Sequence, residues 1–290
     1  MKLKLILVTI LFVTSIRSDT PTLLLHYTFD EGSGPAKDSS GFGTPADAEL
    51  SGSAARSSKT PGQSGGYSLD LTRNGPAYAS VASPDKLSSH ETFSLSFWVN
   101  SSVPSYTGTT FLTYASGTGN TYIYMEIDQS GAINPGYNHA IFSVRNLESE
   151  PPSNLTVVKS SDKSLYNNWT FYAITWGGGL LRMYEGTEKQ PVILDSSFAT
   201  IPINRFRGNL IIGEDSTGQA KLLVDDFRYY DGAADQSFLE QVRLEGLTQV
   251  PEPSTLVLAS VGGVALLLFS RAAEARRKRE SVKGRSVVWS

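Results

Sequence analysis

The chain has 290 residues, of which 40% are hydrophobic and 18% charged, and it contains no cysteine. The hydrophobic fraction suits a globular core, whereas the lack of cysteine excludes a disulfide scaffold, a thiol nucleophile, iron–sulfur clusters and cysteine-ligated zinc. Both ends are basic, while the region 19–270 is acidic, with 15 basic against 26 acidic side chains. An acidic body has no electrostatic reason to bind nucleic acid, so we expect no nucleic-acid partner.

The N-terminus has the pattern of a secretory signal peptide. Lys2 and Lys4 precede an apolar run over residues 5–13, and small and polar residues follow it. The run is too short to span a bilayer and shows no amphipathic alternation of the kind a first strand would have. We therefore predict a signal peptide over residues 1–18 and export of the chain.

The body between the two ends shows recurrent alternation of apolar and polar residues, interrupted by stretches rich in glycine, proline and serine. This pattern is typical of short antiparallel strands, and without alternating helices it favours a sandwich or jelly roll. One short helix is predicted over residues 235–247. The sequence thus predicts one all-β domain over residues 20–248, a jelly-roll β-sandwich of two antiparallel sheets. Its expected strands are residues 22–29, 93–99, 121–127, 169–176, 180–185, 210–213 and 221–230.

Several of these segments resemble the laminin-G-like domains of the concanavalin A-like jelly-roll fold, in that family's order. The opening LLLHYTFDEGSG, the central FSLSFWVNSS and NNWTFYAITWGGGLLRMYEGTE, and the closing LVDDFRYYDGAADQSFLEQV carry the resemblance. It implies the sandwich fold. It does not imply one activity, because this fold hosts lectins, adhesins and hydrolases.

The C-terminal region over residues 250–290 joins three features. Pro251, Glu252 and Pro253 precede an uncharged apolar stretch over residues 255–270, and a basic tail follows over residues 271–290. Sixteen apolar residues are near the lower limit for a transmembrane helix, and the positive-inside rule places the tail in the cytoplasm. We predict a C-terminal transmembrane helix over residues 255–270.

The same three features closely resemble the PEP-CTERM sorting signal of Gram-negative, biofilm-forming bacteria. The resemblance implies an inner-membrane anchor, recognition by an exosortase, removal of the anchor, and release to the cell surface or the exopolysaccharide matrix. One departure is the tail, which continues to Ser290 where the family usually ends just after the basic cluster.

An enzymatic interpretation centres on Glu126 and Asp128. Glycosidases of the laminarinase type carry a similar E-x-D-x-x-E strand, but the position of the second glutamate is Gly131 here, and Ser130 precedes it. A retaining mechanism needs two carboxyl groups about 5 Å apart. Because the second is missing, we predict that the chain is not an enzyme.

The same strand also permits a binding interpretation. Strand alternation would place Tyr122, Tyr124, Glu126 and Asp128 on one face. Aromatic rings can stack on the C–H faces of a sugar while carboxylates accept hydrogen bonds from its hydroxyls. These four residues are therefore the candidate ligand-binding residues. The alternative is that the tyrosines form cross-strand pairs that stabilise the sheet without a ligand.

Alternation also predicts that Asp225 lies on the apolar face that Leu223 and Phe227 share, so that it points inward. Asp226 and Arg228 would then point outward and pair with each other. A buried carboxylate is costly without a partner, so Asp225 needs either backbone N–H donors or a cation.

A calcium ion is the cation that we consider for Asp225. Calcium prefers six to eight oxygen ligands, which an acidic, cysteine-free exported domain can supply. Some laminin-G-like domains are similar in binding calcium. Asp30 and Asp38 are the candidate metal residues to join Asp225, and hydrogen bonding of Asp225 within the loop is the alternative.

Together these observations predict an exported, non-catalytic binding or adhesion module at the cell surface or in the matrix, which contacts carbohydrate or another surface protein. Two alternatives stay open. One is a degenerate or unusual glycoside hydrolase, and the other is a purely structural protein of the exopolysaccharide matrix.

Overall fold

The computed structural model describes residues 20–63, 65–82, 85–87, 92–101, 109–115, 121–128, 138–146, 153–161, 167–177, 179–199, 209–214 and 220–248. The predicted signal peptide and the sorting region from residue 249 onward lie outside these ranges. For the strands between residues 109 and 161 the description covers the backbone.

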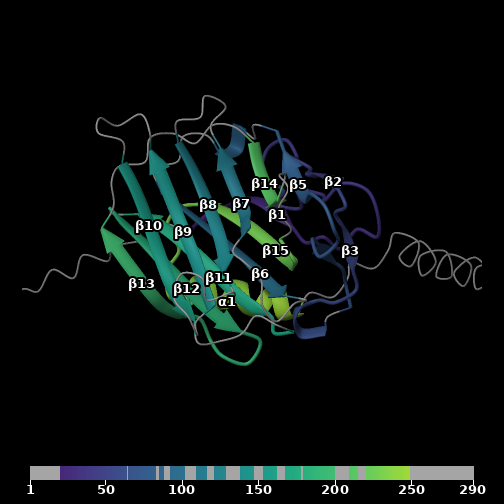
Figure 1. Ribbon diagram of the computed structural model, residues 1–290. Helices are drawn as coiled ribbons and strands as arrows, with labels where there is room; N and C mark the ends of the chain where they lie inside the picture. Colours follow the sequence, from purple (N-terminus) through teal and green to yellow (C-terminus); the bar gives the residue numbers. More distant parts are fainter. Residues whose placement is uncertain are drawn as a thin grey trace, which may run out of the picture.

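Within the described residues the strands form two antiparallel sheets, one of eight and one of seven strands (Figure 1). The eight-stranded sheet has the order β13-β12-β11-β6-β15-β4-β3, with β1 also paired to β15, and the seven-stranded sheet has the order β10-β9-β8-β7-β14-β5-β2. The first sheet contains β1 (Thr22–Tyr27), β3 (Ala55–Ser57), β4 (Ser68–Asp70), β6 (Phe93–Ser101), β11 (Thr170–Gly177), β12 (Leu180–Thr187), β13 (Ile193–Ala199) and β15 (Leu222–Asp231). The second contains β2 (Glu49–Gly52), β5 (Ala77–Val81), β7 (Thr109–Ala115), β8 (Thr121–Asp128), β9 (Asn138–Asn146), β10 (Ser153–Ser161) and β14 (Asn209–Glu214). The predicted sandwich is confirmed.

The main core lies between the two sheets, and alternation along β6 shows how it forms. Phe93 and Phe97 point inward with every second residue of this strand, and both are fully buried. The Phe93 ring lies 5.7 Å from that of Tyr229, and the Phe97 ring 6.4 Å from that of Phe227, measured between centroids. Aromatic pairs at such distances add to the free energy of apolar burial.

A second apolar cluster lies on the outer face of the eight-stranded sheet, under α1 (Gln236–Thr248). Leu239 and Val242 of the helix pack there with Trp98 of β6. The predicted helix over residues 235–247 is confirmed, with each end displaced by one residue. Among the described residues, no helix is long and apolar enough to cross a membrane.

Strand β15 contains a β-bulge that the sequence pattern did not reveal. The register with β6 shifts between Asp225 and Arg228, and Asp226 has a positive φ of 49°. One extra residue in a strand inverts the alternation beyond it. Leu223 therefore packs under α1, whereas Phe227 packs between the sheets. The prediction that Leu223 and Phe227 share a face is wrong for this reason.

Asp235 caps the N-terminus of α1, since its Oδ1 accepts a hydrogen bond from the Phe238 N–H at 2.8 Å. This bond satisfies one of the donors that a helix leaves free at its start. We expect Asp235→Ala to lower the free energy of unfolding by about 1 kcal/mol, as other lost N-caps do. Urea denaturation followed by tryptophan fluorescence measures the change, and Asp235→Asn, which keeps the acceptor, serves as the control that stays near the parent value.

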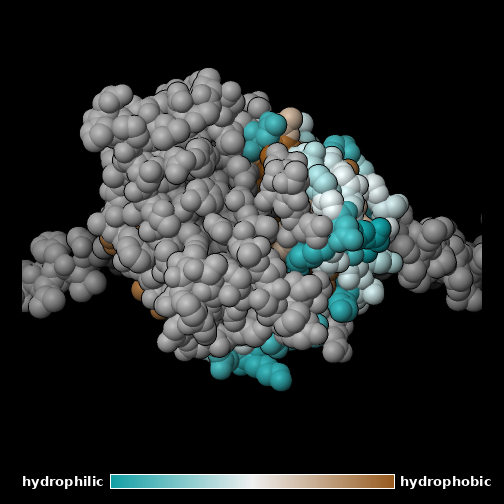
Figure 2. Space-filling view, in the orientation of Figure 1, coloured by the Kyte–Doolittle hydropathy of each residue, from teal (hydrophilic) through white to brown (hydrophobic). Residues whose placement is uncertain are grey.

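The space-filling view shows that the coloured surface over β2, β3 and β5 is mostly hydrophilic, with brown only in small spots (Figure 2). This part of the surface thus offers polar loops and no broad apolar patch, and a binding site there would have to be polar.

Candidate functional site

Two adjoining hollows lie at the end of the eight-stranded sheet where β11 begins and β12 ends. They have volumes of about 400 and 420 Å³ and share Trp169 and Glu188, so we treat them as one feature and call it the Trp169 hollow. Its lining comes from four separate segments of the chain. The lining residues are Ser58, Lys59, Thr60, Gly65, Asn100, Asn167, Asn168, Trp169, Thr170, Thr187, Glu188, Lys189 and Gln190.

Trp169 is anchored from below by the outer apolar cluster. Its side chain is 7% exposed and packs in the cluster that contains Trp98 and Phe171. The Trp98 and Phe171 rings meet edge to face, with centroids 5.4 Å apart. The Asn167 N–H donates to the carbonyl of Ser101 at 3.0 Å, which joins the start of β11 to the end of β6. The floor of the hollow is therefore held by packing and backbone bonds.

The turn after β12 forms one wall and is fastened at both ends. The Gln190 N–H donates to Thr187 Oγ1 at 3.0 Å, and Arg243 Nη1 of α1 donates to the Thr187 carbonyl at 2.6 Å. Glu188 Oε1 accepts a hydrogen bond of 2.7 Å from the Gly62 N–H. These contacts hold the backbone of this turn and the Glu188 side chain in place before any ligand arrives, which lowers the entropic cost of binding.

Gly62 lies in the short helical turn η1 (Pro61–Gln63), with a positive φ of 64°. A Cβ at this position would lie 2.5 Å from the carbonyl oxygen of Leu247, in the last turn of α1. Only glycine fits both the conformation and the close approach. The loop that bears Lys59 and Thr60 is thus pressed against the C-terminal end of α1.

The chemistry of the hollow is that of a polar site beside an aromatic ring. Amide, hydroxyl, ammonium and carboxylate groups border it, and they can donate to or accept from the hydroxyls of a sugar. Polar groups that converge beside an aromatic side chain are typical of small-ligand sites. Sequence reasoning missed this hollow, because its segments are distant along the chain. The polar residues on either side of Trp169 and after β12 were the available signal.

The predicted ligand-binding residues Tyr122, Tyr124, Glu126 and Asp128 all fall on β8, which is confirmed as a strand between β7 and β9. Their side chains lie outside the described part of the structure. The binding role of this strand therefore stays a prediction.

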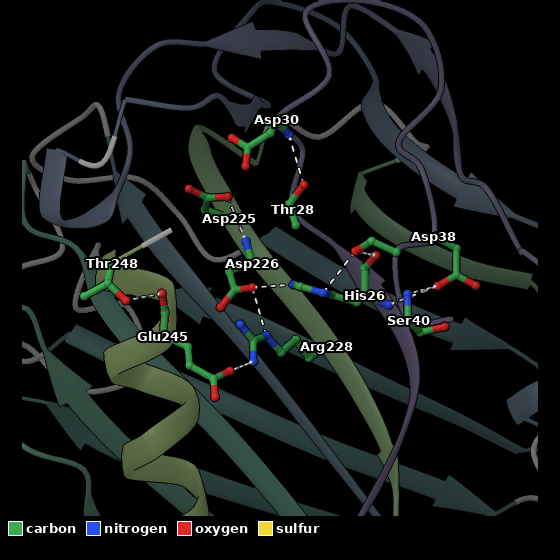
Figure 3. A network of polar contacts seen from close by, with 11 residues as sticks. His26, Thr28, Asp30, Asp38, Ser40, Asp225, Asp226, Arg228, Glu245 and Thr248 are labelled. Atoms are coloured by element: carbon green, nitrogen blue, oxygen red, sulfur yellow. Dashed lines mark hydrogen bonds and ion pairs between the residues drawn. The ribbon is translucent and has the colours of Figure 1, made fainter. Parts of the chain in front are cut away.

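The three candidate metal residues do not converge on one site. Asp38 pairs with Lys86 and accepts hydrogen bonds from the backbone N–H groups of Ser40 and Ala46, at 3.1 and 3.0 Å. Burial alone would raise the pKa of Asp38, but Lys86 and these N–H groups hold the pKa below its usual value. Figure 3 shows Asp38 beyond His26, away from Asp225. Its carboxylate already has its partners.

Asp30 and Asp225 lie near each other, and each accepts a backbone hydrogen bond of 2.8 Å, from Tyr67 and Asp226 respectively. Burial raises the pKa of both carboxyls, and for Asp225 the charges of Asp226 and Asp30 raise it further. Among the described residues, no group of three or more histidine, aspartate or glutamate side chains is placed to hold a metal ion. Asp30, Asp38 and Asp225 thus do not fit one shared calcium ion.

A buried charge network joins β1, β15 and α1 (Figure 3). Asp226 Oδ1 lies 2.7 Å from His26 Nε2 and 2.9 Å from Arg228 Nε, and Arg228 also pairs with Glu245 of the helix. The predicted pair of Asp226 and Arg228 is confirmed, but it does not face solvent, since the two residues are 0% and 5% exposed. The sequence missed this burial because α1 covers the face that alternation assigned to water.

Ser39 extends this network to the surface, with its Oγ 3.0 Å from His26 Nδ1. The order serine, histidine, aspartate is that of a nucleophile relay. Arg228, however, donates a hydrogen bond to Asp226 Oδ1, the oxygen that His26 also contacts. Because Arg228 already neutralises this carboxylate, Asp226 is less able to stabilise a positively charged His26. Ser39 also lies 3.1 Å from the carbonyl of His26. We assign the group a structural role, in which it fastens the loop after β1 to β15.

Comparison with known families gives two matches. Residues 73–237 match the family described as the concanavalin A-like lectin/glucanases superfamily, and residues 249–272 match the PEP-CTERM protein-sorting motif. The second match contains the predicted sorting residues Pro251 to Pro253, so both resemblances found in the sequence are confirmed. No curated protein matches this sequence.

Solved structures with the same fold include the binding domains of toxins and one domain of an enzyme. The binding domain of botulinum neurotoxin DC in complex with SialylT aligns with a TM-score of 0.54 and 18% identity, over 78% of this chain and 51% of that chain. Domain 4 of a GH43 extracellular arabinanase from Geobacillus stearothermophilus, in complex with arabinotriose, aligns with a TM-score of 0.52 and 18% identity, over 77% and 98%. The chain thus spans about half of the neurotoxin binding domain and nearly all of the arabinanase domain. At such identity the likeness shows the fold.

Proposed function

The chain belongs to the concanavalin A-like lectin/glucanases superfamily, and from this premise we propose that it is an exported, non-catalytic carbohydrate-binding module that acts at the cell surface or in the extracellular matrix. The sorting motif at its C-terminus implies export, with anchoring in the membrane before processing. An exosortase is the proposed processing enzyme for this motif. A glycan is the proposed ligand of the jelly-roll domain.

The observation that carries the proposal is the Trp169 hollow. It has the volume of a small-ligand site, its polar groups suit sugar hydroxyls, and Trp169 supplies the aromatic border. Two similar structures support a glycan as ligand, since one domain was solved with SialylT and another with arabinotriose. A carbohydrate is thus the ligand class that agrees with both the lining and the fold.

Strand β8 is a second proposed contact surface, through Tyr122, Tyr124, Glu126 and Asp128. It lies in the seven-stranded sheet, whereas the Trp169 hollow lies at the end of the other sheet. Substitutions can therefore test the side chains of one surface without changing those of the other. We propose no hydrolysis at β8, because Gly131 stands where the second acid would be needed.

We expect Lys189→Ala to weaken glycan binding roughly tenfold or more, because hydrogen bonds from charged donors contribute about 1.5–3 kcal/mol. Lys189 is exposed and lines the hollow, so its truncation removes a donor without opening the core. A glycan array with the purified full chain in detergent identifies the ligand, and isothermal titration calorimetry with the best oligosaccharide measures the affinity.

Lys37→Ala is the matched control, since Lys37 is an exposed lysine whose partner is Asp47 and which does not line the hollow. This variant should bind as the parent does. A variant with Tyr122→Ala and Tyr124→Ala tests β8 in the same way. If no oligosaccharide on the array is retained, the carbohydrate proposal is wrong and a structural matrix role is favoured.

A further inference from the structure

The Trp169 hollow and the point where the chain leaves the body lie at the same end of the fold. Leu247, in the last turn of α1, contacts Gly62, and the Gly62 N–H donates to Glu188 in the wall of the hollow. Leu247 also packs on the outer apolar cluster, which contains Trp169. Gly62 therefore links the end of the helix directly to the wall of the hollow.

The direction of α1 places this end opposite the hairpin between β11 and β12. A Cβ on Gly177, the last residue of β11, would lie 2.5 Å from the Cβ of Ala233, just before the helix. The helix has 13 residues, so it carries the chain about 20 Å, from the hairpin end to the hollow end. Figure 1 shows α1 against the strands of the eight-stranded sheet.

The segment between α1 and the predicted membrane anchor is short, so it keeps the end of the helix close to the membrane. Six residues, 249–254, separate Thr248 from the start of the apolar stretch at Thr255. At an extended length of about 3.3–3.6 Å per residue they reach about 20 Å. When residues 255–270 hold the chain in the bilayer, the end of α1 must therefore lie within about 20 Å of the membrane surface.

We propose that the anchored chain holds the Trp169 hollow toward the bilayer, and that removal of the anchor makes the hollow accessible to polymeric glycan. The ligand in this inference rests on the function proposed above, whereas the position of the hollow does not. The space between the hollow and the membrane surface admits a short oligosaccharide, but the membrane hinders the approach of a long polysaccharide chain from that side. Anchor removal thus releases the protein and also opens its binding site.

The absence of cysteine permits a direct measurement of this orientation, because a single introduced cysteine carries the only label. Lys189→Cys marks the hollow, and Ala233→Cys marks the opposite end of α1. Both positions are exposed. Each full-length variant is labelled with a fluorophore and reconstituted in phosphatidylcholine vesicles that contain a lipid with a headgroup-attached nitroxide quencher.

We expect the label at position 189 to be quenched at least twice as strongly as the label at position 233. A 30-residue Gly/Ser linker inserted between Thr248 and Gln249 should remove this difference, because the body can then rotate freely. Equal quenching at the two positions in the chain without the linker, or stronger quenching at position 233, would overturn the inference.

The link between orientation and binding is tested with a protease site written into residues 249–254 without changing their number, and with the same site inside the Gly/Ser linker. At the native tether length, cleavage should raise retention of a long polysaccharide at least fivefold and leave the affinity for its oligosaccharide unchanged. Unequal quenching without any glycan retained would contradict the proposed function alone. Glycan binding that is the same before and after cleavage would contradict the opening of the site.

Discussion

Asp226→Asn is expected to lower the free energy of unfolding by about 3 kcal/mol, because it leaves a buried cation without its main counter-charge. Arg228 is 5% exposed and, among the described residues, would keep Glu245 as its one acidic partner. Burial by itself raises the pKa of Asp226, but Arg228 and His26 outweigh it and hold the pKa below its usual value. The charged form of Asp226 is therefore the one that the fold stabilises.

The sign of the pH dependence follows from that lowered pKa. A carboxyl with a depressed pKa in the folded state contributes stability above its unfolded pKa of about 3.9, and this contribution is lost as the pH falls through the folded value. Urea denaturation of the parent and of Asp226→Asn at several pH values between about 3 and 7 measures this contribution. Asp47→Asn is the control, since Asp47 pairs with Lys37 at the surface, where solvent screens ion pairs and they contribute little to stability. Equal losses in both variants would contradict the role of the buried network.

Asp225→Asn, one position earlier, is expected to act in the opposite direction and to stabilise the protein at neutral pH by about 1 kcal/mol or more. Burial, Asp226 and Asp30 together raise the pKa of Asp225 well above its usual value. Each pKa unit of such a rise costs about 1.4 kcal/mol when the group is charged. An asparagine removes this cost, and its Oδ1 can still accept the hydrogen bond from the Asp226 N–H.

The gain should be largest at neutral pH and should shrink in acid. As the pH falls below the raised folded pKa, the parent carboxyl becomes protonated in the folded state and the penalty shrinks; it is gone only below the unfolded pKa of about 3.9. Thermal unfolding of both proteins in EDTA, over the same pH series, tests this. Repeating it with calcium chloride tests the calcium prediction, because a metal held by Asp225 would turn the gain into a loss and make the parent melt higher with calcium.

Those segments whose alternation is unbroken could be predicted from the sequence with nearly correct bounds. β6 and β11 show it best, since every second residue of each strand faces the inter-sheet core, as local pattern requires. The helix after β15 was likewise visible, because Leu239 and Val242 recur at helical spacing and Asp235 can cap it. Local geometry alone decides these features.

The bulge at Asp226 and the Trp169 hollow could not be predicted in this way. A bulge adds one residue to a strand without a required residue type, so alternation was carried past Asp225 and gave Leu223 the wrong face. The hollow needs Glu188 to meet Gly62, which are 126 positions apart. The residue pattern within one segment cannot predict a contact between residues so far apart in the sequence.

The sequence by itself thus determined the class of fold, the exported destination and the two families, because each depends on patterns or motifs within a continuous stretch of chain. Only the tertiary structure decided which acids are buried as ion pairs, that Asp38 belongs to Lys86, and that a polar hollow lies beside the exit of the chain. The partners of a buried charge and the walls of a hollow come from segments that are far apart in the sequence and meet only on folding. The free energy of a buried ion pair depends on how deeply it is buried, and that burial is created by several segments together.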